Sequence, residues 1–250
     1  MIAARTLEVG TGATIHYLSP SGSDGGPCTV VLPCRSLDRA YDLAAPGDVV
    51  ELAAGSYPGD QTIDGDKAAP GVLFRPAAGA TVTLGTVTIE ASNLELRDLT
   101  LESWDARYPS DTVVARNLDV EWFETHGSRN TSVLGGDIGP SYTPGGASPN
   151  IRIGYAENSA GIDQPTRNLL IDGATIHDFG RGTPADHMEC LFVIGVDGLQ
   201  IRNSTFTRCD IYSIFFTHAW WTNPGIITNT NILLENNVFD ESTNHGQYGG

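Results

Sequence analysis

Lysine is almost absent from this chain: Lys67 is the only one, against 30 acidic residues, and the formal net charge is -16. A surface this acidic repels nucleic-acid phosphates and anionic membrane surfaces. Long apolar runs are also missing, since no stretch approaches the roughly 20 apolar residues that cross a bilayer. We therefore expect neither a nucleic-acid partner nor a membrane partner.

Cysteine is scarce, with four residues, and it carries information about the compartment. Cys28 and Cys34 flank the short turn PCTVVLPC without the second CxxC or the His pair of a zinc site, so a local disulfide is expected. A disulfide indicates an oxidising compartment, and hence a secreted, extracellular protein. The first residues, MIAARTLEVG, lack the pattern of a signal peptide. Cys190 and Cys209 lie in apolar surroundings, which fit buried free thiols as well as a second bridge.

Helical periodicity is nearly absent too, and in its place one pattern recurs. An apolar alternation leads to Asn, Asp or Gly, and after two further residues comes a large apolar residue, as in LELRDLTL (94–101) and LQIRNSTF (199–206). Such a strand cannot bury its apolar face alone, but coils stacked about 4.8 Å apart bury it in a continuous core. Asn side chains at equivalent turns would then form a ladder. The closing apolar residues are Leu101, Val120, Ile138, Ile176, Phe206 and Phe239.

One helix is expected near the start of the chain, in PCRSLDRAYDLAAPGDVVEL. Ser36 suits the N-cap, and Pro46 with Gly47 would end the helix. Such a helix would cover the open end of the stack, where strand edges are otherwise unpaired. The residues on its apolar face are Leu37, Ala40, Tyr41 and Ala44.

These two features together resemble a known superfamily. YLSPSGSDGGPC, followed by PCRSLDRAYDLAAPGDVVELAAGSY, is similar over residues 17–57 to the entry segment of the pectate-lyase-like right-handed parallel β-helix proteins. HMECLFV followed by IRNSTF also resembles poorly characterised secreted bacterial β-helix repeat proteins. The resemblance implies an all-β, single-stranded right-handed parallel β-helix, or solenoid, with an N-terminal capping α-helix. It is weak for chemistry, because the superfamily contains lyases, hydrolases, epimerases, adhesins and tailspikes.

The expected organisation is one β-helix domain over residues 1–250. The entry strand and capping helix would occupy about 14–57, and the stacked coils about 72–240. The sequence ends at NHGQYGG without an obvious capping element, so a C-terminal cap and further coils are expected to be missing.

The stretch GRGTPADHMECLFVIG (180–195) carries the densest group of chemically active side chains. If residues 187–195 form a strand, His187 and Glu189 point outward, while Met188, Cys190 and Phe192 face the core. An outward His-x-Glu pair can act as base and acid, and Arg181 can stabilise developing negative charge. His177 in the same loop region is a further catalytic candidate.

The superfamily resemblance also suggests a cation. Its pectate-lyase-type members hold Ca²⁺ with several carboxylates beside an Arg or Lys base, so Asp178 and Asp186 are candidate ligands for Ca²⁺. No cofactor is certain, and Lys67, near the capping end, is a poor base. The alternative is that these charged side chains are only solvated, or pair with Arg181 or Arg208.

The stretch THAWWTNPG (217–225) offers a second kind of site. Trp220 and Trp221 beside His218 could stack on sugar rings, because adjacent exposed tryptophans are costly. One of them could instead cover the coil below. Asp210 is a further candidate for substrate binding.

Together with these residues, the superfamily resemblance implies a secreted, monomeric protein that binds an extracellular polysaccharide along an outer sheet wall. It would cleave the polymer as a lyase or a glycoside hydrolase. The alternative is a non-catalytic glycan-binding, adhesin or structural module, in which the outward charged side chains are only solvated surface residues.

Overall fold

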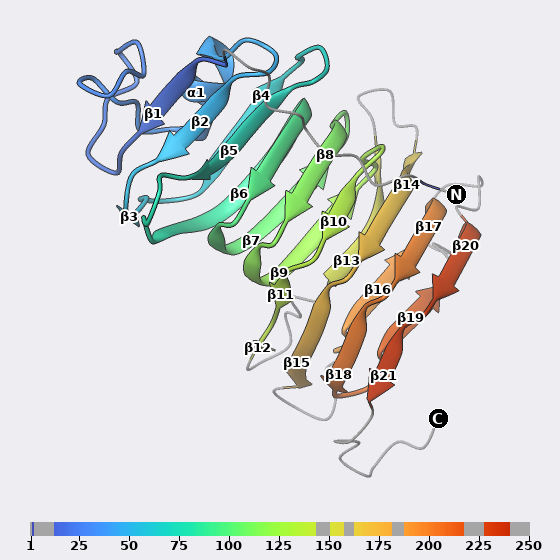
Figure 1. The fold of residues 1–250 in the computed structure, drawn as a ribbon. Helices are drawn as coiled ribbons and strands as arrows, with labels where there is room; N and C mark the ends of the chain where they lie inside the picture. The colour runs from blue at the N-terminus through green and yellow to red at the C-terminus, as the bar shows by residue number, and fades with distance from the viewer. Residues whose placement is uncertain are drawn as a thin grey trace.

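Three walls of stacked parallel strands wind around one apolar core (Figure 1). The computed structural model describes residues 2, 13–143, 151–157, 163–181, 188–217 and 228–240. Each strand pairs in parallel with the equivalent strand of the next coil, as Leu94 does with Val113. The expected fold is confirmed: the chain is a right-handed parallel β-helix with an N-terminal helix.

The described residues form 21 strands, and the longest of them bend from one wall into the next. The first wall contains β1 (Ile15–Leu18), β2 (Val49–Leu52), β5 (Val72–Pro76), β8 (Asp111–Arg116), β10 (Ser132–Leu134), β14 (Asp163–Asp172), β17 (Val196–Arg202) and β20 (Thr230–Glu235). The second wall contains β3 (Gly55–Ser56), β11 (Asp137–Ile138), β12 (Ser141–Thr143), β15 (Thr175–Arg181), β18 (Thr205–Cys209) and β21 (Val238–Asp240). The third wall contains β4 (Gln61–Gly65), β13 (Ile151–Glu157), β16 (Leu191–Ile194) and β19 (Ile214–Thr217). The strands β6 (Val82–Arg97), β7 (Thr100–Arg107) and β9 (Asp119–His126) contribute to the third wall and to at least one other wall.

The helix α1 (Leu37–Leu43) lies at the N-terminal end of the stack (Figure 1). The side chain of Ser36 accepts a hydrogen bond from the backbone N–H of Arg39, which caps the helix as the sequence predicts. Leu37, Ala40 and Tyr41 are buried, so α1 covers the core of the first coils. This is the only helix within the described part of the chain, and it is far too short to cross a bilayer.

The turns between the first and second walls explain the recurring Asn and Asp residues. Asn117 and Asn203 have φ values of 49°, and Asp98 has a φ of 55°, in the left-handed region that Asn and Asp tolerate best. Their side chains also link successive coils, since Nδ2 of Asn117 donates to Oδ1 of Asp98 over 3.1 Å. The expected ladder is present only in part, because Gly135 and Gly173 occupy this turn in the coils between Asn117 and Asn203.

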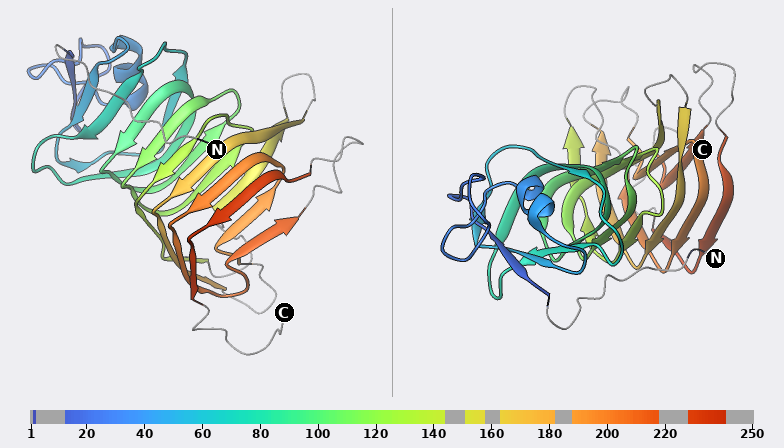
Figure 2. Two further views of the ribbon diagram at one scale, coloured as in Figure 1. Left: turned by 45° about the vertical axis from the view of Figure 1, so that its right-hand side comes forward. Right: turned by 90° about the horizontal axis from the view of Figure 1, so that it is seen from above.

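The core consists of inward side chains stacked in register. Leu94, Leu96, Val113 and Ala115 are almost completely buried, and the rings of Trp104 and Phe123 stack with their centroids 4.6 Å apart. Figure 2 shows the coils following one axis from α1 to the last strands, β20 and β21. Because each coil closes the core of the one before it, the outer face of every wall can carry polar side chains without cost to the core.

Candidate functional site

The outer face of the third wall carries a compact group of charged side chains. In the register of β7, β9 and β13, Asp105 lies beside Glu124, and Glu124 lies beside Arg152. In the next outward row, Arg107 lies beside His126. The neighbours Trp104, Ala106 and Thr125 are buried and point inward. We call Asp105, Arg107, Glu124, His126 and Arg152 the wall cluster.

Asp105 organises the wall cluster. Its side chain is only 3% exposed, and its Oδ1 lies 3.0 Å from Nδ1 of His126. Its Oδ2 accepts a hydrogen bond from Nε of Arg107. A carboxylate that accepts from Nδ1–H sets the tautomer of an imidazole and leaves Nε2 with its lone pair. Within the part of the chain that the structure describes, Nε2 of His126 has no hydrogen-bond partner.

Two arginines and one glutamate surround this pair. Nε of Arg152 lies 3.9 Å from Oε1 of Glu124, and Oε2 of Glu124 lies 3.9 Å from Nδ1 of His126. The side chains of Arg107 and Arg152 are about half exposed, at 51% and 47%. Both guanidinium groups can therefore reach a ligand in solution, and carboxylate is the group that their planar geometry suits best.

The two carboxyl groups have pKa values that move in opposite directions. Burial acts to raise the pKa of Asp105, but the hydrogen bonds from His126 and Arg107 outweigh burial and hold this pKa below its usual range. Burial raises the pKa of Glu124, since its charged neighbours at longer range do not offset the loss of water. Asp105 is thus held as a carboxylate, while Glu124 retains a proton to a higher pH. Such a separation is typical of acid–base sites.

The backbone around His126 is held from behind. The hydroxyl of Thr166 donates to the carbonyl of Gly154 over 2.6 Å and accepts from the backbone N–H of Gly127 over 3.2 Å. Gly154 is the neighbour of His126 in the next coil, and a Cβ there would lie 3.4 Å from Cδ2 of His126. The absence of a side chain at Gly154 leaves the Nε2 edge of the imidazole open.

Asp105, Glu124 and His126 are also the residues that could hold a metal ion, because their ligand atoms all lie within 4.8 Å of one another. They do not fit Ca²⁺, which takes six to eight oxygen ligands, whereas this group offers two carboxylates and a nitrogen. Both oxygens of Asp105 are already engaged by His126 and Arg107. We therefore assign the wall cluster no metal step.

The residues predicted from the stretch 180–195 lie elsewhere. Arg181 forms an ion pair with Asp210, with Nε and Oδ2 2.9 Å apart, and its backbone N–H donates to the same oxygen. Glu189 was expected on an exposed outer face, but it is fully buried, with an exposed fraction of 0%. The strand β16 begins only at Leu191, and the buried Cys190 before it is bonded to Cys209. The catalytic role of Arg181 and Glu189 and the substrate-binding role of Asp210 remain predictions.

His177 and Asp178 lie on the second wall. The two ring nitrogens of His177 contact Asp178 and Asp137, at 2.6 Å and 3.0 Å. Asp178 also accepts two hydrogen bonds from Arg208, and these hydrogen bonds lower the pKa of Asp178 to about 2. With both nitrogens engaged, His177 has no lone pair directed at solvent, so it is less suited to a base role than His126. Its catalytic role, and the metal-binding role of Asp178, remain predictions.

Five of the predicted site residues lie outside the described residues. These are Asp186, His187, His218, Trp220 and Trp221.

The cysteines form two disulfides. Cys28 is bonded to Cys34, as the short turn predicts. Cys190 is bonded to Cys209, which settles the pairing that the sequence left open. The second disulfide joins the segment before β16 to the end of β18, and so fixes one coil to the next.

The wall cluster was missed at first because its members are dispersed in the sequence. A signal was present: the segments SWDAR (103–107) and EWFETH (121–126) place Asp-x-Arg and Glu-x-His at the same phase of successive repeats. Aligning these repeats residue by residue would have placed the charged side chains together on one outer face.

Comparison with known proteins supports the fold and leaves the activity open. No family model matches the chain, and no curated protein matches its sequence. Among solved structures, it is similar to a rhamnogalacturonan lyase, with 14% sequence identity and a TM-score of 0.52 over 91% of this chain. The match covers 62% of the length of that lyase. Pectate lyase Pel9A is more distant, with 10% identity and a TM-score of 0.47 over 96% of this chain and 82% of Pel9A. At such identities the first similarity establishes a shared parallel β-helix fold, and the second adds no further weight.

Proposed function

We propose that this chain cleaves an acidic extracellular polysaccharide by β-elimination at a uronate residue, on the outer face of the third wall. The observation that carries the proposal is the contact of the buried Asp105 with the partly exposed His126, flanked by the half-exposed guanidinium groups of Arg107 and Arg152. A base held in one tautomer beside two carboxylate-binding groups is the equipment that this reaction requires.

The arginines address the problem of charge. A chain with a net charge of -16 repels a polyanion at long range, so productive binding needs local positive charge. Arg107 and Arg152 can each bind one face of a uronate carboxylate by paired hydrogen bonds. The main barrier to elimination is the removal of the weakly acidic C5 proton. Neutralising the adjacent carboxylate makes this proton more acidic and so lowers the barrier.

The elimination then uses two side chains. Nε2 of His126 removes the C5 proton, the electron pair forms the C4=C5 double bond, and the C4–O4 bond breaks. Glu124 donates its proton to the departing O4, consistent with its raised pKa. Asp105 stays ionised, holds Nδ1–H of His126 and stabilises the imidazolium that forms.

A hydrolase would use Asp105 and Glu124 as its two carboxyl groups. The burial of Asp105 argues against this function, because its side chain is 3% exposed and both its oxygens are engaged. Elimination asks Asp105 only to orient His126, a role that burial favours.

The two disulfides support an oxidising location for this activity. We propose a location outside the cytoplasm, where the chain would meet an extracellular polysaccharide.

The test is product release from a panel of polyuronates and neutral polysaccharides, followed by the absorbance of unsaturated uronate. The wild type should release unsaturated product from a polyuronate. The His126→Ala variant should lose this activity by about 10²-fold or more, while His177→Ala, a histidine on the second wall, should retain it. Binding without unsaturated product on any substrate would refute the elimination and favour a glycan-binding module.

A further inference from the structure

The wall cluster continues into an aromatic strip on the same outer face. Arg152 of β13 pairs with Phe192 of β16, and Phe192 pairs with Phe215 of β19, so each ring lies one coil further along the stack. Leu191 and Val193 are fully buried, so Phe192 between them points outward, and the expectation that Phe192 faces the core is wrong. The strip is thus a direct extension of the charged rows.

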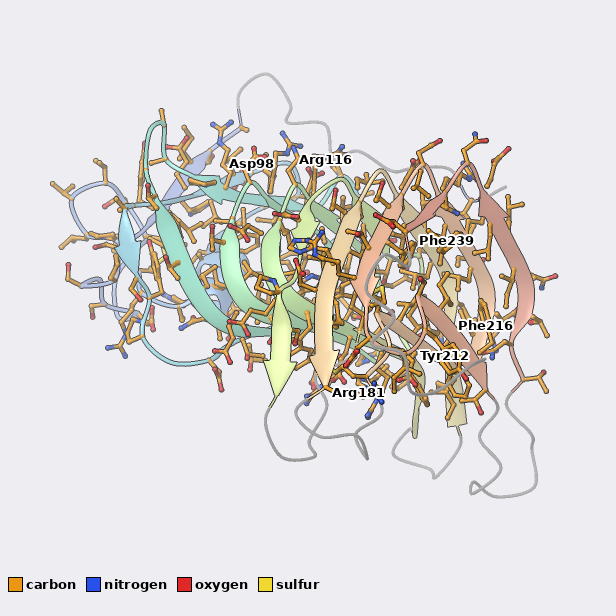
Figure 3. All side chains as sticks on the ribbon, turned by 90° about the horizontal axis from the view of Figure 1, so that it is seen from below. Asp98, Arg116, Arg181, Tyr212, Phe216 and Phe239 are labelled. Atoms are coloured by element: carbon orange, nitrogen blue, oxygen red, sulfur yellow. A yellow bond between two sulfur atoms is a disulfide. The ribbon has the colours of Figure 1, made fainter. Side chains whose placement is uncertain are left out.

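Three rings make up this strip. The centroids of Phe192 and Phe215 are 5.6 Å apart, and the ring of Tyr212 stacks on Phe215 at 5.5 Å with an interplanar angle of 14°. Tyr212 is 42% exposed and lies at the surface of the C-terminal coils (Figure 3). We call Tyr212, Phe192 and Phe215 the aromatic strip.

The aromatic strip is held in place by bonds beneath it. The backbone carbonyl of Tyr212 accepts a hydrogen bond of 3.0 Å from the N–H of Cys190, which is itself bonded to Cys209. Asp210, two residues before Tyr212, is fixed by its ion pair with Arg181. Rings that are ordered before a ligand arrives lose little entropy when they bind it.

The charge along this face changes abruptly at the strip. Beyond Arg152 the described outward positions are Phe192, Ile194, Phe215 and Thr217, none of which carries a charge. A carboxylate above these rings would lose water without gaining a partner. A neutral pyranose would instead place its C–H face on the aromatic rings, which offer a flat apolar surface.

We propose that the aromatic strip binds a neutral sugar of the same chain whose uronate lies at the wall cluster. This inference rests on the proposed function and refines its substrate: the polymer contains neutral sugars next to its uronates. Successive coils are about 4.8 Å apart, a spacing close to the length of one sugar residue. Neighbouring sugars can therefore lie over neighbouring coils, the uronate on Arg152 and the neutral sugar on Phe192, whose ring packs beside that of Phe215.

Binding is measured by affinity electrophoresis and calorimetry with the intact chain carrying His126→Ala, so that no cleavage intervenes. The probes are a homopolymer of uronate and a polymer in which uronates alternate with neutral sugars. Phe215→Ala and Tyr212→Ala should each weaken binding of the alternating polymer by about tenfold and leave binding of the homopolymer unchanged. Tyr212→Phe, which keeps the ring, and Phe239→Ala, which removes an exposed ring from the second wall, are the controls.

Equal losses for both polymers, or no loss for either, would overturn the aromatic subsite. Thermal unfolding of each variant shows whether a loss arises from an altered fold, and Phe215→Leu, which keeps the apolar volume, then replaces a variant that unfolds. The proposed elimination is tested by a different assay, the release of unsaturated product by the chain with His126 intact, so the two proposals can fail independently. Selective loss of the alternating polymer would support the subsite whatever the outcome of that assay.

Discussion

Replacing Asp105 with asparagine tests whether the buried carboxylate serves the chemistry or only the fold. Asp105 makes two charge-assisted contacts, with His126 and with Arg107. Such contacts contribute about 1.5–3 kcal/mol each, but asparagine keeps one acceptor and the half-exposed Arg107 can be hydrated again. We therefore expect Asp105→Asn to lower the free energy of unfolding by about 2 kcal/mol, which corresponds to roughly 4–8 °C in Tm for a chain of this size.

The activity should fall much further. An asparagine cannot hold the imidazolium that forms at His126, and its amide can impose the wrong tautomer, so kcat should drop by about 10²–10⁴-fold. The stability difference also depends on pH. The folded-state pKa of Asp105 is lowered, so its contribution is fully present above its unfolded pKa of about 3.9 and is lost as the pH falls through the folded value.

A matched control lies at the other end of the molecule. Asp48 accepts from His16 over 3.0 Å, the same distance that joins Asp105 to His126. Asp48→Asn should lower Tm by a similar amount and leave turnover unchanged. Thermal unfolding and release of unsaturated product, measured on both variants, decide the matter. Equal turnover in the two variants would refute the role assigned to Asp105.

Three further outcomes follow from the same contacts. Glu124→Gln should raise Tm at neutral pH, because the pKa of Glu124 is raised in the folded protein and its ionised form therefore destabilises the fold. This gain in Tm should vanish in unfolding scans below about pH 4, where the carboxyl group is protonated in both states. Turnover should fall, because glutamine cannot donate the proton. The double variant Cys190→Ala, Cys209→Ala removes a disulfide of sequence separation 19 and should lower the free energy of unfolding by about 3 kcal/mol. An unchanged midpoint of denaturant unfolding would show that this disulfide does not stabilise the stacking of the two coils. Trp104→Ala should lower the free energy of unfolding by about 3–5 kcal/mol, since the Trp104 ring is buried on Phe123. Trp122→Ala should lower it clearly less, because Trp122 is only partly buried, and calorimetry on both variants measures the difference.

The fold could be predicted because its signals are local. Ser36 before an apolar helical face and Pro46 after it specify α1, and a turn residue such as Asn117 or Asn203 needs only its own backbone conformation to mark a coil. These signals repeat, so each coil confirms the next. Stacking then follows from the need to bury one face of every strand.

The candidate site could not be found in the same way, because it is assembled across coils. Asp105, Glu124 and Arg152 are far apart in sequence and become neighbours only through the register of β7, β9 and β13. The densest local group of active residues instead drew attention to Glu189. Glu189 is buried next to Cys190, which pairs with Cys209, and sequence alone does not specify that pairing.

If His126 starts an elimination at a uronate, no oxygen from solvent enters the products, and isotope labelling tests this. Cleavage of a polyuronate in water enriched in heavy oxygen, followed by mass spectrometry of the products, separates the two reactions. Elimination predicts unsaturated ends without solvent oxygen, formed by the wild type and lost in His126→Ala. Saturated ends that carry the heavy isotope, or products that persist in His126→Ala, would contradict the account.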